Sequence, residues 1–219
     1  MERSRLGIVI PAYNEAATIA SVVQGVKNLG QPIVVNDNSS DETAELAGNA
    51  GAVVVSHEQN KGYDQALESG FQQADKIGCE YVVTMDADGQ HDPSILGIYI
   101  NEMDNGTDMV LGVRDRRQRI AEHVFAWIAG LLWGIDDPLC GMKGYRMDVY
   151  RKLGHFDSYG SIGTELAIYG VRSGYSFVQV PVATRDRTGE SRFGRAIKGN
   201  YLILRAAMLS FFLIRPVKA

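Results

Sequence analysis

The most constraining feature of this sequence is the alternation of short, continuously apolar segments with segments of helical spacing. Five apolar runs are predicted as strands, at residues 6–12, 32–35, 52–55, 81–85 and 109–113. Between them, apolar residues three and four apart predict helices at 16–29, 41–50, 62–77 and 93–105. Strands that are apolar throughout and alternate with helices are typical of a mostly parallel sheet covered on both faces. We therefore predict an α/β fold in a single domain spanning residues 1–219.

The second half of the chain is less regular. It is predicted to contain helices at 148–153 and 164–172, a strand at Phe177–Val182 and a C-terminal amphipathic helix at 195–214. Residues 124–135 carry no charge. This run is shorter than the ~20 residues that cross a bilayer, so we interpret it as a core or an interfacial helix.

Charge and cysteine content narrow the class of protein. The net charge is −4, which argues against a nucleic-acid partner. The two cysteines, Cys79 and Cys140, are far apart and suit a reducing compartment. Seven lysines and arginines follow residue 186 against Glu190 alone. This basic end favours contact with an anionic surface, and a solvated basic helix is the alternative.

Polar side chains follow the predicted strands at the points where the strands end. Tyr13 follows the first strand, Asp37 the second, Asp86 and Asp88 the fourth, and Arg114 the fifth. In open α/β sheets, ligands bind at the carboxyl ends of the strands. We therefore expect these side chains to share one site.

The strongest chemical signal is the pair Asp86 and Asp88 after a buried strand. Two carboxylates this close repel each other, and a cation such as Mg²⁺ or Mn²⁺ relieves the repulsion. Mg²⁺ is usually held by one or two carboxylates together with substrate phosphates. Gln90 is a further oxygen ligand in reach. The alternative is a helix cap, a role that Asp92 fits better because it precedes Pro93.

Asp37 and Tyr13 are candidates for nucleoside binding. A helix start explains Asp41 and Glu42, but Asp37 lies too early for a cap. Its carboxylate can accept hydrogen bonds from a base or a ribose, and Tyr13 offers a flat face. Glu15 is a candidate cap of the next helix as well as a site residue.

In order along the chain, these motifs resemble the family 2 glycosyltransferases of GT-A fold, and most of all the polyprenyl-phosphate sugar synthases of the dolichol-phosphate mannose synthase type. The matching segments are residues 10–15, 34–41, 60–62, 85–93, 111–114, 141–145, 164–165, 180–182 and 186–192. The resemblance covers nearly the whole chain. It implies a donor half at 1–115 and an acceptor half at 116–219.

The resemblance also implies roles for individual residues. Asp86, Asp88 and Gln90 are expected to hold Mg²⁺ or Mn²⁺ at the donor diphosphate. The residues expected to act in the reaction are Asp88, Arg114, Glu165 and Arg187. Those expected to bind substrate are Pro11, Ala12, Tyr13, Glu15, Asp37, Lys61, Gly62, Asp86, Gln90, Arg119 and Arg192.

The implied reaction moves a sugar with inversion from a GDP- or UDP-sugar to a polyprenyl or dolichyl phosphate. A phosphate acceptor is largely ionised at neutral pH, since its second pKa is ~6, and it needs cations rather than a base. Arg114, Arg116, Arg117 and Arg119 form a dense cationic cluster suited to this task. A hydroxyl acceptor would need a carboxylate base, for which Glu165 and Asp137 are the candidates.

Three other functions stay open on the sequence. They are a soluble family 2 enzyme acting on a cell-envelope glycan or small hydroxyl acceptor, a nucleotidyltransferase, and a catalytically silent nucleotide-binding module. Basic residues beside apolar and aromatic ones in 124–135 and 195–214 favour a lipid acceptor. We therefore expect a cytoplasmic protein in peripheral contact with the cytoplasmic face of a membrane.

Overall fold

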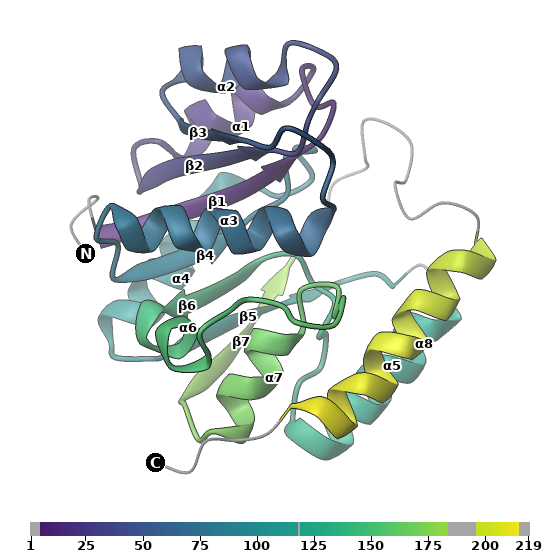
Figure 1. The fold of residues 1–219 in the computed structure, drawn as a ribbon. Helices are drawn as coiled ribbons and strands as arrows, with labels where there is room; N and C mark the ends of the chain where they lie inside the picture. The colour runs from purple at the N-terminus through teal and green to yellow at the C-terminus, as the bar shows by residue number, and fades with distance from the viewer. Residues whose placement is uncertain (1–4, 118, 184–195, 215–219) are drawn as a thin grey trace.

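A computed structural model describes residues 5–117, 119–183 and 196–214 (Figure 1). Its centre is a seven-stranded sheet in the order β3-β2-β1-β4-β6-β5-β7. Every neighbouring pair is parallel except those of β6, which runs antiparallel to β4 and β5. The strands are β1 (Leu6–Ala12), β2 (Gln31–Asn36), β3 (Val53–Ser56), β4 (Tyr81–Thr84), β5 (Met109–Arg114), β6 (Lys143–Arg146) and β7 (Phe177–Val182).

The predicted mostly parallel sheet is confirmed, and β6 is the strand that the sequence did not predict. Its four residues read Lys-Gly-Tyr-Arg, which lacks an apolar run. Lys143, Gly144 and Tyr145 are nevertheless buried, because β6 lies between β4 and β5 in the interior of the sheet. Sheet neighbours therefore stabilise this strand, whose own composition gives little sign of it.

Helices cover both faces of the sheet. They are α1 (Ile19–Val26), α2 (Thr43–Ala50), α3 (Tyr63–Lys76), α4 (Leu96–Asp104), α5 (Ile120–Trp133), α6 (Met147–Leu153), α7 (Glu165–Arg172) and α8 (Ala196–Leu213), with a short 3₁₀ turn, η2 (Pro93–Ile95). Successive residues of β1 point to opposite faces, so that Val9 packs in one core with α3 and α7 while Ile8 and Ile10 pack in the other with α1. The helices predicted between the first five strands are all present, and α1 is shorter than the predicted 16–29.

Helices α5 and α8 lie side by side at one edge of the molecule (Figure 1). The apolar run 124–135 falls largely within α5, which begins earlier, at Ile120. The predicted C-terminal helix is present, but its amphipathic character is not confirmed, because α8 carries apolar residues on its exposed as well as its buried side. Among the described residues, no helix combines the length and the apolar character that a membrane span requires.

Gly70 lets α3 pack closely on the sheet. A Cβ placed there would lie 2.2 Å from Cγ1 of Val9, a stiff β-branched side chain. We expect Gly70→Ala to lower the free energy of unfolding by roughly 1–2 kcal/mol, because the clash exceeds the gain in helix propensity. Gly97→Ala on α4 is the control, since nothing lies within 4 Å of its Cβ position. Equal free energies of unfolding in urea for Gly70→Ala and Gly97→Ala would contradict this prediction.

Candidate active site at the carboxyl ends of the strands

The polar residues that follow β1, β2 and β4 are brought together, as predicted from the parallel order of these strands. Pro11 and Ala12 are buried at the end of β1, and Tyr13 beyond them is exposed. The buried Glu15 accepts a hydrogen bond from Thr18 Oγ1 at 3.1 Å. The same Oγ1 lies 2.7 Å from the carbonyl oxygen of Ala87, so its one proton is shared between two acceptors and links the segment after β1 to the Asp-Ala-Asp turn after β4.

Asp37 anchors the loop that precedes α3. Its Oδ1 accepts the backbone N–H of Lys61 and its Oδ2 that of Gly62, each at 2.8 Å. His57 Nδ1 lies 2.7 Å from the same Oδ1. The carboxylate is buried and is fixed by these partners, so Asp37, Lys61 and Gly62 form one unit. The sequence interpretation did not include His57, which reaches Asp37 from the end of β3.

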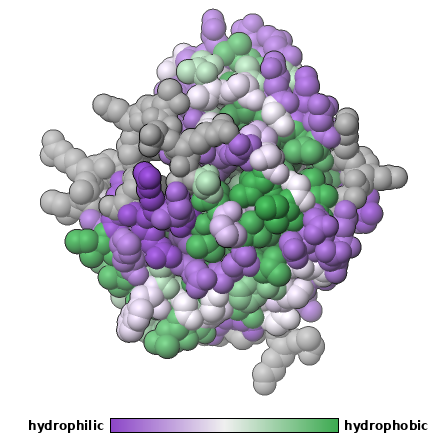
Figure 2. All heavy atoms as spheres, turned by 180° about the vertical axis from the view of Figure 1, so that it is seen from behind, coloured by the Kyte–Doolittle hydropathy of each residue, from purple (hydrophilic) through white to green (hydrophobic). Residues whose placement is uncertain are grey.

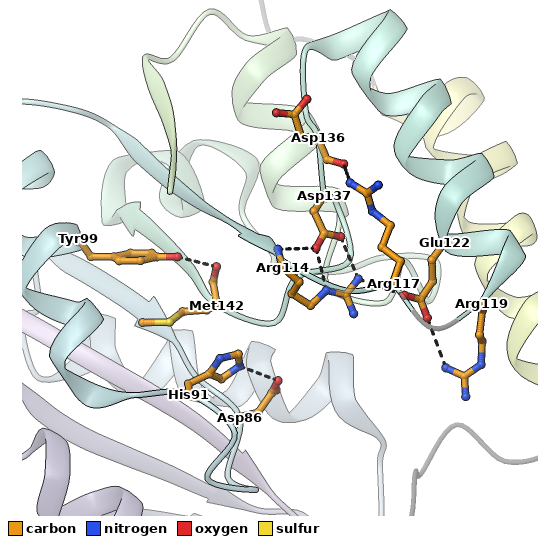
Figure 3. Close-up of polar contacts among 10 residues, drawn as sticks. All are labelled: Asp86, His91, Tyr99, Arg114, Arg117, Arg119, Glu122, Asp136, Asp137 and Met142. Atoms are coloured by element: carbon orange, nitrogen blue, oxygen red, sulfur yellow. Dashed lines mark hydrogen bonds and ion pairs between the residues drawn. The ribbon is translucent and has the colours of Figure 1, made fainter. Parts of the chain in front are cut away.

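Asp86 and Asp88 lie in the turn after β4. His91 Nε2 is 3.3 Å from Asp86 Oδ2, as Figure 3 shows, and Asp88 Oδ1 accepts the backbone N–H of Gln90 at 3.1 Å. Burial raises the pKa of Asp86, but the bond to His91 and the nearby cationic groups outweigh it and lower that pKa below its usual value. Asp86 is therefore ionised at neutral pH.

Gly141 makes room for the Asp86 carboxylate. A Cβ at this position would lie 2.4 Å from Asp86 Oδ2 and 2.9 Å from its Oδ1. The carbonyl of Gly141 accepts a hydrogen bond from Thr84 Oγ1 at 2.6 Å, which ties this segment to β4. The approach to β6 thus forms one wall beside Asp86.

The acidic turn fits a divalent cation that is shared with a substrate. Asp86, Asp88 and Gln90 supply oxygen ligands of the kind that Mg²⁺ and Mn²⁺ prefer. Among the described residues, no group of three or more His, Cys, Asp or Glu side chains forms a complete metal site. A cation held by one or two carboxylates takes its remaining ligands from phosphate or water, so the donor set fits an ion that arrives with a diphosphate.

Arg114, at the end of β5, forms a bidentate pair with the buried Asp137. Its Nε lies 2.7 Å from Asp137 Oδ2 and its Nη2 lies 2.9 Å from Oδ1 (Figure 3). Burial raises the pKa of Asp137, but the bonds from Arg114 outweigh it and lower that pKa below its usual value. Asp137 is thereby held as the partner of a cation, and a carboxylate so stabilised is a poor proton acceptor.

The other arginines of the cluster lie between β5 and α5. Arg117 Nη2 donates to the carbonyl of Asp136 at 2.7 Å, and Arg119 Nη1 lies 3.6 Å from Glu122 Oε1. Arg116 is exposed. Arg187 and Arg192, which the resemblance places near the donor, lie outside the described residues.

Glu165, at the start of α7, is buried and surrounded by local donors. Its oxygens accept the backbone N–H of Ser158 at 2.6 Å and the hydroxyl of Ser158 at 2.8 Å, and His155 Nε2 lies at 3.1 Å. These contacts hold the loop before α7. The oxygens of the carboxylate are thus occupied by partners in its own loop, which is a structural role rather than that of a free base.

Lys143 is a buried cation that the sequence interpretation did not single out. Its Nζ donates to the carbonyl of Gly163 at 2.8 Å. Burial lowers the pKa of Lys143 to about 8, although the charges of Asp137 and Asp86 oppose this. The motif 141–145 contained the residue, but only the position of β6 in the sheet shows that the amine faces the site and the loop before α7.

The fold and this site define a protein of the glycosyltransferase class. The family model "Glycosyl transferase family 2" matches residues 7–124. A dolichyl-phosphate hexose transferase of Haloferax volcanii is 30% identical over 85% of this chain and 86% of its own length. A polyprenol monophosphomannose synthase of Mycolicibacterium smegmatis is 30% identical over 82% of this chain and 77% of its own. The chain therefore belongs to glycosyl transferase family 2.

A solved structure agrees with this assignment. Glucosyl-3-phosphoglycerate synthase from Mycobacterium tuberculosis, in complex with Mn²⁺, uridine diphosphate and glucosyl-3-phosphoglycerate, has a TM-score of 0.74 and 25% identity. The match covers 94% of this chain and 78% of that one. The GT-A architecture predicted from the motifs is confirmed, and the protein is a glycosyltransferase.

The pair of Arg114 and Asp137 also contributes to stability. We expect Asp137→Ala to lower the free energy of unfolding by about 3 kcal/mol at neutral pH, because it removes the bidentate partner of a largely buried arginine and leaves the longer contact to Glu122. The pKa of Asp137 is lowered in the folded state, so this difference narrows as the pH falls below 3.8, the usual value. Urea unfolding of the wild type and of Asp137→Ala at several pH values measures this difference in the free energy of unfolding.

Asp136→Ala is the matched control for Asp137→Ala. The side chain of Asp136 is exposed and accepts one hydrogen bond, from Gln179 Nε2 at 3.2 Å. We expect this variant to lose less than about 0.5 kcal/mol. Equal decreases in the free energy of unfolding for Asp136→Ala and Asp137→Ala would show that the pair of Arg114 and Asp137 does not stabilise the fold.

Proposed function

We propose that this glycosyltransferase moves a sugar from a nucleoside-diphosphate sugar to a polyprenyl phosphate, with inversion and with a divalent cation. One observation carries the choice of acceptor. Both carboxylates considered as bases for a hydroxyl acceptor are occupied, Asp137 by Arg114 and Glu165 by Ser158 and His155. A phosphate acceptor needs no base, because its oxygen is already ionised. The two relatives whose names include dolichyl phosphate or polyprenol support the same choice.

The donor is proposed to bind at the ends of β1, β2 and β4. Tyr13 offers an exposed ring for a base, and the unit of Asp37, Lys61 and Gly62 borders the same edge. Asp86, Asp88 and Gln90 would hold Mg²⁺ or Mn²⁺, which neutralises charge on the diphosphate when bound. The Mn²⁺ and uridine diphosphate in the solved relative support this donor class.

In the proposed reaction, a phosphate oxygen of the acceptor attacks the anomeric carbon. A new C–O bond forms as the bond from that carbon to the diphosphate breaks, and the electron pair leaves with the diphosphate. No proton has to be removed. Arg114 is the cation placed to orient the acceptor, because Asp137 fixes its guanidinium. Residues 1–115 would then serve the donor, and 116–219 the acceptor.

The apolar surface of α5 and α8 is proposed to contact a membrane. Trp127 is 70% exposed, Leu131 72% and Phe212 67%, so large apolar side chains face solvent on both helices. Figure 2 shows the opposite side from Figure 1, and apolar residues reach the left edge, where these helices lie. Helix α5 starts beside the arginine cluster, so a lipid held at this surface has its phosphate near Arg114. This supports peripheral attachment to a membrane, and we propose the cytoplasmic face as its side.

A transfer assay tests the proposed function. Purified protein is incubated with radiolabelled GDP- or UDP-sugars and Mg²⁺ or Mn²⁺, with and without undecaprenyl or dolichyl phosphate. We expect label from one donor to enter the organic phase only when the lipid phosphate is present. Label transferred instead to a water-soluble acceptor such as 3-phosphoglycerate supports a second candidate, a soluble-acceptor enzyme, which the likeness to glucosyl-3-phosphoglycerate synthase favours.

Asp88→Asn tests the metal-dependent donor site. We expect it to weaken binding of the nucleoside diphosphate in the presence of Mn²⁺ at least about tenfold, because it removes one anionic ligand. Asp92→Asn is the control, since Asp92 caps η2 through the backbone N–H of Ser94 and asparagine also caps. Titration calorimetry measures both. Unchanged affinity in the Asp88 variant would remove this aspartate from the donor site.

Replacing Trp127 and Leu131 together by serine tests the membrane surface. We expect vesicle binding to fall roughly tenfold or more, because two large apolar side chains no longer enter the interface. Ile98→Ser is the control, as Ile98 is 48% exposed on α4, away from α5 and α8. Co-sedimentation with vesicles that contain anionic lipid gives the bound fraction. Equal binding by wild type and the double variant argues against this surface.

A further inference from the structure

We infer that Glu122 is a positioning residue that holds Arg114 and Arg119 at the spacing needed to receive one acceptor phosphate. Glu122 lies in the first turn of α5 and is 5% exposed. Its Oε2 is 3.3 Å from Arg114 Nη2, and its Oε1 is 3.6 Å from Arg119 Nη1. Figure 3 shows its carboxylate between the two guanidinium groups. The inference deepens the proposed function and rests on it.

The two arginines reach Glu122 from different elements. Arg114 is the last residue of β5, and Arg119 immediately precedes α5. Two guanidinium groups that contact the same carboxylate would repel each other if that carboxylate were absent, and they would no longer be held in fixed directions. Glu122 offsets that repulsion with one oxygen for each arginine. It therefore links the end of the sheet to the helix that carries the apolar surface.

A helix-start acid alone does not account for this arrangement. An acid in the first turn is favourable to the helix dipole when exposed, but burying a carboxylate costs free energy unless charged partners compensate it. Glu122 is buried and is the only acid in α5. The two arginines thus contribute charged partners to a buried carboxylate, which sets Glu122 apart from exposed first-turn acids such as Glu45 of α2.

Arg114 keeps donors for a ligand. Its backbone N–H, Nε and Nη2 donate to Asp137 and Glu122. Nη1 makes no bond to any residue in the described part of the chain. The guanidinium is therefore fixed along one edge by acids and offers the other edge, the geometry in which arginine binds phosphate.

The test is the kinetics of Glu122→Gln in the transfer assay. The glutamine amide cannot accept from both arginines, so one of them loses its orientation. We expect the KM for the polyprenyl phosphate to rise about tenfold, the effect of losing one charge-assisted contact, while the KM for the nucleotide sugar stays within about twofold. Glu45→Gln, an exposed first-turn acid on α2, is the matched control and should leave both constants unchanged.

A double-mutant cycle separates positioning from a merely structural role. Because Asp137 still holds Arg114 when Arg119 is replaced, Glu122→Gln is expected to have less effect on the acceptor KM in the Arg119→Gln background than in the wild type. Additive effects of the two substitutions would overturn the inference. So would an acceptor KM that is unchanged or lower in Glu122→Gln, since a lower KM means that the acid screens the arginines instead of placing them.

Two further readouts keep the result interpretable. Wild type that fails to label lipid phosphate refutes the proposed function, whereas wild type that is active beside an unaffected Glu122→Gln refutes the positioning role alone. Thermal unfolding shows whether Glu122→Gln is folded. If Glu122→Gln is not folded, Glu122→Asp replaces it in the assay. Aspartate keeps the negative charge on a shorter side chain, so we expect a smaller rise in the acceptor KM.

Discussion

Strand β6 runs antiparallel between β4 and β5, and the two chemical parts of the site meet because of this insertion. The segment that leads into β6 contacts both neighbours before it pairs with them. Asp137 holds the guanidinium of Arg114 beyond β5, and Gly141 lies against the carboxylate of Asp86 beyond β4. Thr84 fixes the carbonyl of Gly141. A side chain at Gly141 or a lost acid at Asp137 therefore disturbs one part of the site directly and the other through the same short backbone segment.

Buried charges in this protein are arranged in sets that balance each other. Arg114 is held by Asp137 and Glu122, and Glu122 in turn faces Arg119. Such sets contribute little net stability compared with apolar packing, but removing one member leaves an unpaired charge. Their value lies in geometry, because they fix the directions of guanidinium groups that a flexible loop would otherwise leave free. Glu165 is likewise surrounded by hydrogen-bond partners, Ser158 and His155, and these contacts hold the loop before α7.

Helix α5 joins the site to the apolar surface of the molecule. Its first turn carries Glu122, and its outer side carries Trp127 and Leu131, which together with the exposed residues of α8 form an apolar face at one edge. An exposed apolar surface of this kind commonly marks an interaction site. The cationic site thus lies at the start of a helix whose outer side is apolar further along. An acceptor with a long apolar chain and an anionic head would use both features.

The sequence by itself determined the parallel β/α order, the placement of polar residues at the strand ends and the family. These follow from local patterns: apolar runs, helical spacing and motifs whose residues are neighbours in the chain. The tertiary structure decided what local patterns do not encode. It placed β6 inside the sheet although its residues have no strand signature, buried Lys143 there, and paired Arg114 with Asp137 and Asp37 with His57. It also committed Glu165 to its own loop. These contacts join residues whose proximity arises from sheet order and helix packing, and their energies depend on burial, which only the folded chain provides.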